Sequence, residues 1–182
     1  MIFPGGDSET SEVLDAETWR SWSQGPRWYY VLAAMIRDER VERRRQHVAE
    51  VLGPTLQLTS PGQPHVTVRA IGFEPYDWTP LTVELEVLGP DTFTTAVYLK
   101  VRSPEIMRLR KKLDTVSPAL PVEDRQTPYT PHVTVGTYLE RVALCEVQQT
   151  LDETGSMQPI PLAAEVRQVA VDTRSTLGQL RD

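Results

Sequence analysis

Cysteine is nearly absent from this 182-residue chain, since Cys145 is the only one. A single cysteine cannot form a disulfide within the chain and is typical of a reducing compartment. Long apolar runs are also missing. The longest, Tyr29 to Ile36, is far shorter than the roughly 20 residues that a membrane-spanning helix needs. The N-terminus lacks the basic start and apolar stretch of a secretory signal. We therefore expect a cytoplasmic protein without a membrane segment.

Basic residues are fewer than acidic residues. The chain has 19 Lys and Arg against 25 Asp and Glu, a net charge of −6 and a pI near 5.2. Proteins that track a long nucleic-acid backbone usually carry an excess of basic residues, so this balance argues against extended duplex binding. A small phosphate compound or an RNA end needs only a local positive pocket. Such partners remain compatible with an acidic protein.

A pentapeptide, Pro-His-Val-Thr-Val, occurs twice, at residues 64–68 and 131–135. Its histidines, His65 and His132, are 67 residues apart, and each copy follows a predicted strand and a predicted helix. The pattern indicates a duplicated strand-helix-strand unit. We expect an N-terminal extension over 1–27 and one domain over 28–182, of a size that buries a core.

The predicted elements define the fold class. The expected strands are 29–36, the two pentapeptides, 81–88, 95–101 and 165–172, and the expected helices are 38–52, 103–116 and about 140–150. Helices and strands do not alternate strictly. The sequence therefore predicts an α+β fold in which two pseudo-symmetric lobes form a mostly antiparallel sheet around a central groove.

Each pentapeptide carries chemistry on one face of its strand. Side chains alternate along a strand, so His65 and Thr67 share a face, as do His132 and Thr134. Histidine changes charge near neutral pH, so two imidazoles can act as general base and general acid. The threonine hydroxyls can donate hydrogen bonds to phosphoryl oxygens.

A metal or cofactor is not expected. Neither motif offers a second His, Cys or carboxylate at the spacing of a zinc site.

Two other interpretations of the repeated pentapeptide do not require catalysis. The repeat can serve packing alone, because Val-Thr-Val is a good strand sequence. The groove can also bind RNA ends or nucleotides without turnover. The sequence leaves the oligomeric state open.

The two motifs resemble those of the two-histidine phosphoesterase superfamily, with its 2′-5′ RNA ligase-like and cyclic phosphodiesterase branches. That superfamily carries two His-x-Ser/Thr-x motifs in a duplicated, bilobal fold. The segment 129–136, Tyr-Thr-Pro-His-Val-Thr-Val-Gly, is similar to the second motif of the ligase-like branch. The resemblance covers residues 28–172. One departure is Gly136-Thr137-Tyr138, where some relatives carry a basic residue.

The resemblance implies metal-independent hydrolysis of 2′,3′-cyclic phosphate ends of RNA or of small cyclic nucleotides. One histidine would activate water and the other would protonate the leaving sugar oxygen, and the sequence does not assign these two roles. A 2′-5′ RNA ligase, in which a 5′-hydroxyl replaces water, is the alternative reaction.

Three further residues are candidates for phosphate or base contacts. Arg69 shares the face of His65 and Thr67 if the strand continues regularly, and Tyr138 shares the face of His132 and Thr134 by the same argument. Lys100 lies on the predicted strand 95–101. The basic runs 43–45 and 108–112 are interpreted as solvated helix faces.

Overall fold

The computed structural model describes residues 10–13, 27–58, 63–116, 128–172 and 180–181. Strands and helices follow one another along the chain with these bounds: β1 Trp28–Met35, α2 Glu39–Leu52, the 3₁₀ turn η1 Gly53–Thr55, β2 Leu56–Leu58, β3 His65–Gly72, β4 Leu81–Thr92, β5 Ala96–Arg102, α3 Pro104–Val116, β6 His132–Tyr138, α5 Leu144–Glu153, β7 Ile160–Asp172 and β8 Leu180–Arg181.

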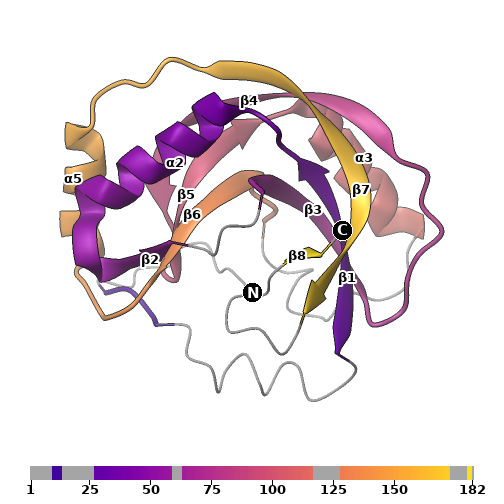
Figure 1. Cartoon of the computed structure of the whole chain (residues 1–182), viewed down its shortest axis with the longest axis horizontal. Coiled ribbons are helices and arrows are strands. Elements are labelled where there is room, and N and C mark those ends of the chain that lie inside the picture. Colours follow the sequence, from indigo (N-terminus) through magenta and orange to yellow (C-terminus); the bar gives the residue numbers. More distant parts are fainter. Residues whose placement is uncertain (1–9, 14–26, 59–62, 117–127, 173–179, 182) are drawn as a thin grey trace.

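The strands form one antiparallel sheet in the order β2-β6-β5-β4-β7-β1-β3, with β8 added beside β7. The long strands β4 and β7 pair at its centre. On either side of them lie the duplicated units, which we call the first unit (β1, α2, β3) and the second unit (β5, α3, β6). Figure 1 shows the sheet curved into an arch, with β3 and β6 close together. The α+β fold predicted from the sequence is confirmed.

The two helices of the units begin with equivalent side-chain caps. The Asp38 carboxylate accepts a hydrogen bond from the Arg40 N–H at 2.8 Å, and the Ser103 hydroxyl oxygen accepts one from the Ile106 N–H at 3.1 Å. These caps are 103 − 38 = 65 residues apart, whereas the histidines are 132 − 65 = 67 apart. The second unit therefore has two extra residues between its helix cap and its motif histidine, so a single offset of 67 does not hold throughout.

The central strands are longer than predicted. β4 continues to Thr92 and β7 begins at Ile160, because the two strands pair with each other over Leu81 to Val87 and each also pairs with one unit. The third helix starts at Leu144 rather than near Glu140. The short strand β2, which the sequence pattern did not indicate, covers the outer edge of β6.

Apolar side chains divide the sheet into two faces. The large core joins one face to the helices and contains Leu32, Val66, Val68, Val133 and Val135, all nearly inaccessible to solvent. A smaller cluster on the opposite face contains alternate residues of β1 together with Val169 and Val171. The motif valines therefore anchor both motif strands beneath the helices, as their positions in the pentapeptide predict.

The helices α2 and α3 each pack against the motif strand of the other unit. α2 of the first unit contacts β6 of the second, and α3 of the second unit contacts β3 of the first. Apolar stripes on both helices belong to the main core, with Val41 and Val48 on α2 and Ile106 and Leu113 on α3. The two motif strands are therefore each supported by the helix of the other unit.

Part of the predicted N-terminal extension contacts the domain. Thr10 pairs with Ala143, and the Ser11 N–H donates to the Val142 carbonyl at 2.8 Å. The rest of the extension, 1–9 and 14–26, lies outside the described residues, so the division at residue 27 stays a prediction. Within the described ranges, no helix is long and apolar enough to cross a membrane.

Candidate active site

The two His-Thr pairs lie on the sheet face opposite the main core. Directly opposed residues of antiparallel strands share a face. His65 lies opposite Met35 on β1, and His132 lies opposite Lys100 on β5. Met35 belongs to the smaller apolar cluster, whereas Val66 and Val133 belong to the main core. The alternation expected from the sequence therefore holds over both motifs.

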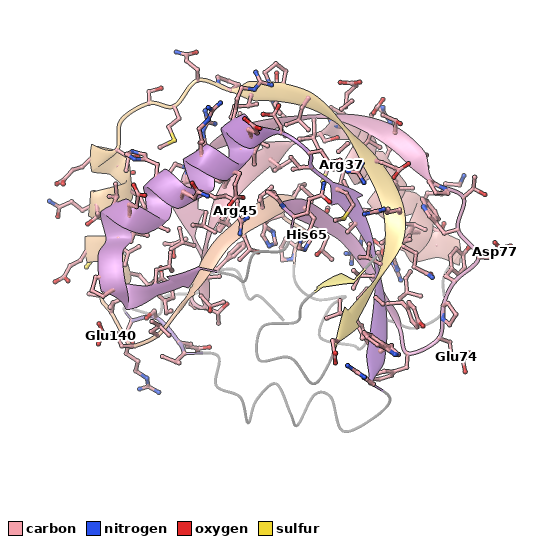
Figure 2. The ribbon with its side chains drawn as sticks, in the orientation of Figure 1. Arg37, Arg45, His65, Glu74, Asp77 and Glu140 are labelled. Atoms are coloured by element: carbon pink, nitrogen blue, oxygen red, sulfur yellow. The ribbon has the colours of Figure 1, made fainter. Side chains whose placement is uncertain are left out.

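The strands that carry the two motifs are brought together by the curvature of the sheet. β3 and β6 contact each other although they do not pair. The charge of His132 also acts on His65 and contributes to lowering its pKa. Figure 2 shows His65 near the centre of the arch with Arg45 beside it, while Glu74, Asp77 and Glu140 lie at the periphery. The motifs therefore form one site rather than two.

Both imidazoles are held in the same way. Nδ1 of His65 donates to the Gln63 carbonyl at 3.2 Å, and Nδ1 of His132 donates to the Thr130 carbonyl at 2.7 Å. A carbonyl oxygen only accepts, so in each ring Nδ1 carries the hydrogen and the neutral ring has its lone pair on Nε2. Each Nε2 can then accept a proton when neutral or donate one when the ring is charged.

Burial shifts both imidazoles toward the neutral form. The pKa of His65 is lowered to about 4, mainly by burial; the positive charges of Arg45 and His132 act in the same direction, and the Gln63 hydrogen bond opposes them. Burial also lowers the pKa of His132, which is opposed by the hydrogen bond to Thr130. Burial therefore favours neutral rings, in which the lone pair on Nε2 is free to accept a proton.

Each motif strand contains a β-bulge directly after its threonine. Ala33 faces Thr67 while its neighbour Leu32 faces Arg69, so Val68 is an extra residue in β3. The strand no longer alternates regularly beyond this point. Arg69 is only 3% exposed and forms an ion pair with Asp114 of α3. It therefore points to the helix side, away from the face of His65 and Thr67 on which alternation predicts it.

The equivalent bulge in β6 redirects Tyr138. Tyr98 faces Thr134 while Val97 faces Gly136, which makes Val135 the extra residue. Tyr138 consequently lies in the main core, where its hydroxyl is 2.5 Å from the Thr92 hydroxyl. The regular alternation that predicted its position beside His132 and Thr134 does not extend past Val135.

Lys100 does lie on the site face, as the cross-strand neighbour of His132. Its ammonium group is 3.6 Å from the Asp91 carboxylate, and its side chain is about half exposed. The rings of Phe93 and Tyr98 stack at 4.0 Å, and both meet the His132 ring edge to face at 5.1 and 5.4 Å. Aromatic contacts thus fix the His132 ring next to a cation.

Arg45 and Tyr129 are site residues that the sequence reasoning missed. The Arg45 side chain is 4% exposed and its Nε donates to the Thr134 carbonyl at 3.0 Å. The Tyr129 hydroxyl donates to the Thr67 carbonyl at 2.9 Å. The interpretation of residues 43–45 as a solvated face is therefore wrong for Arg45. Its place on the apolar stripe of α2, between Val41 and Val48, was the signal available in the sequence.

Within the described ranges, no three His, Cys, Asp or Glu side chains converge as a metal site would require. The groups that meet at the motifs are instead two imidazoles, two threonine hydroxyls and the nearby cations Arg45 and Lys100. This set can bind an anion and move protons at two positions.

Comparison with known proteins gives a family for the chain. No curated protein sequence matches it significantly. The crystal structure of TT0787 of Thermus thermophilus is similar at 16% identity and a TM-score of 0.47, over 79% of this chain and 87% of that one. The family described as the 2′-5′ RNA ligase superfamily matches residues 69–176, which include the second motif and begin just after the first. Since this match spans well over half of the chain, the protein belongs to the 2′-5′ RNA ligase superfamily.

Proposed function

We propose that this protein is a metal-independent phosphodiesterase that hydrolyses 2′,3′-cyclic phosphate ends of RNA or small cyclic nucleotides. His65 and His132 transfer the protons, and Thr67 and Thr134 hold the phosphoryl oxygens. Lys100 contributes positive charge to the same face. Family membership supports a phosphoesterase or ligase-like activity, and the geometry of the two motifs is the basis for the finer proposal.

One observation carries the proposal, namely the matched hydrogen bonds of the two imidazoles. Each Nδ1 is bound to the carbonyl two residues before it, Gln63 in one unit and Thr130 in the other. This arrangement presents both Nε2 atoms for proton transfer beside a threonine of the same strand. Packing alone would not require two identical tautomers on the face opposite the core.

The reaction follows from two such groups. Nε2 of one neutral histidine takes a proton from water as the water oxygen attacks phosphorus. The bond between phosphorus and one ribose oxygen breaks, and the other histidine gives that oxygen a proton from Nε2–H. The negative charge of the bound phosphate favours the protonated form of this second histidine, against the effect of burial. The products are a phosphomonoester and a free ribose hydroxyl. Threonine hydroxyls stabilise the charge on the non-bridging oxygens as the transition state forms.

The family description favours a second candidate, a 2′-5′ RNA ligase. The same groups would then deprotonate a 5′-hydroxyl in place of water, and the product would be a 2′-5′ phosphodiester. The two reactions differ only in the nucleophile. A binding module without turnover is the third outcome that an assay must distinguish.

The test incubates the purified protein with 2′,3′-cyclic mononucleotides and with cyclic-ended oligoribonucleotides, with and without a 5′-hydroxyl acceptor strand. Phosphorus NMR and mass spectrometry identify the products. We expect a phosphomonoester, and its position on the ribose reports which oxygen left. A joined strand would favour the ligase, and saturable binding without product would favour the binding module.

Variants separate this site from a contaminating activity. His65→Ala and His132→Ala should each remove most activity, and the double variant should cost little more, since residues that act as a unit are not additive. His47→Ala is the matched control, because His47 is exposed on α2.

The proposed activity needs no metal ion, so it should persist after prolonged chelation. Loss on chelation with rescue by zinc or manganese would instead indicate a metallohydrolase.

Other aspects of the proposal rest on composition. A net charge of −6 favours RNA ends or small nucleotides over an extended duplex. The cytoplasmic location stays a prediction from the single cysteine.

A further inference from the structure

The bulges at Val68 and Val135 leave the two motif strands without regular pairing at the same point. A bulge disrupts the hydrogen-bond ladder, and backbone carbonyls there need donors from elsewhere. Three side chains supply them. The carbonyls of Thr67, Val68 and Thr134 accept hydrogen bonds from Tyr129, Arg110 and Arg45 at 2.9, 3.2 and 3.0 Å.

The two arginines occupy equivalent positions in the duplicated units. Arg45 is the seventh residue of α2 and Arg110 the seventh of α3. Each reaches across to the motif strand of the other unit, Arg45 to β6 and Arg110 to β3. Their side chains are only 4% and 15% exposed.

Each guanidinium group is oriented by a carboxylate from its own helix. Arg45 Nη1 is 2.7 Å from Glu42, and Arg110 Nε is 3.0 Å from Asp114. Arg110 also lies over the ring of Tyr129, at 4.9 Å from its centroid. Buried arginine is costly unless it is paired, and these partners fix the direction in which each fork points.

We propose that Arg45 and Arg110 are positioning residues. Each bonds the backbone of the other unit's motif strand, and together they set the separation of the His65-Thr67 and His132-Thr134 pairs. The inference rests on the proposed function, because only a reaction that needs both pairs at once depends on their separation. Two proton transfers at one phosphorus atom require both imidazoles in place together. A displacement of about 1 Å costs such a site on the order of 100-fold in rate.

Arg45 has a second effect that Arg110 does not share. The charged groups that act on His65 are Arg45 from α2 and His132 from β6, while its β1 neighbour is the apolar Met35. Removing the positive charge of Arg45 should therefore raise the pKa of His65. A purely structural contact would not produce that change.

The experiment compares Arg45→Met and Arg110→Met with Arg43→Met, which removes the same charge from an exposed position on α2. Single-turnover rates, kcat and KM, thermal melts and NMR titrations of both histidines are measured for each. We expect kcat to fall about 10-fold to 100-fold in the first two variants with a smaller change in KM, and to stay within about twofold in Arg43→Met. Only Arg45→Met should raise the pKa of His65.

Arg45→Lys provides a second test of Arg45 if Arg45→Met does not fold. It keeps the charge, so the His65 titration should remain as in the wild type, but it lacks the planar fork and should recover only part of the rate. If folded variants of Arg45 and Arg110 match Arg43→Met in kcat, KM and titration, the inference is overturned. If the wild type turns over none of the substrates, the proposed function fails. The NMR spectra then test the positioning role, and unchanged resonances of His65 and His132 in both folded Arg45→Met and folded Arg110→Met overturn the inference.

Discussion

His65 should give the folded protein a measurable dependence on pH. Burial, with the charges of Arg45 and His132, lowers the pKa of His65 to about 4 from an ordinary value of 6.5, which the unfolded chain is expected to have. Between these values the unfolded chain binds a proton that the folded protein does not. Stability must therefore fall as the pH is lowered through this window and is restored above it.

The magnitude follows from the size of the shift. Between pH 7.5 and pH 5 the free energy of unfolding should fall by about 2 kcal/mol because of His65 alone. Below pH 4 the loss should level off at about 3 kcal/mol, because the folded ring then also becomes protonated. Such a loss is a large share of the roughly 5 to 15 kcal/mol that stabilises a typical domain.

The test is urea denaturation of the wild type and His65→Asn at pH 7.5, 6 and 5. Asparagine does not titrate, and its amide can donate to the Gln63 carbonyl as Nδ1 does. The wild type should lose about 2 kcal/mol more than this variant between pH 7.5 and 5. His47→Asn, changed at an exposed position, should behave as the wild type. Parallel losses in the wild type and His65→Asn would refute the argument.

Three other predictions concern the motif strands. Thr67→Val and Thr134→Val should each lower the rate of cyclic phosphate hydrolysis about 100-fold to 1,000-fold with little change in melting temperature, while Ser at either position should be far milder. A sharp drop in melting temperature with an intact rate would make the hydroxyls structural. Tyr129→Phe should cost about 1 kcal/mol in urea denaturation by removing the donor to the Thr67 carbonyl, and an unchanged midpoint would contradict this. Val133→Ala, at 1% exposure, should destabilise by about 2 kcal/mol, and a cost near zero would show that the strand is not anchored there.

Local features of the chain were enough to predict much of this molecule. Apolar periodicity and the repeated pentapeptide predicted the helices, the motif strands and the α+β fold. Alternation also predicted that each motif histidine shares a face with its threonine. The shared face follows from the geometry of an extended chain over three residues, so no distant contact is needed to establish it.

Tertiary structure decided what happens beyond those three residues. The bulges at Val68 and Val135 arise from the register with β1 and β5, and they turn Arg69 and Tyr138 away from the positions that alternation predicts. Similarly, Arg45 is buried because the carbonyl of Thr134, distant in sequence, accepts its hydrogen bond. Register and the burial of a charge both depend on partners elsewhere in the chain, and only the folded sheet supplies them.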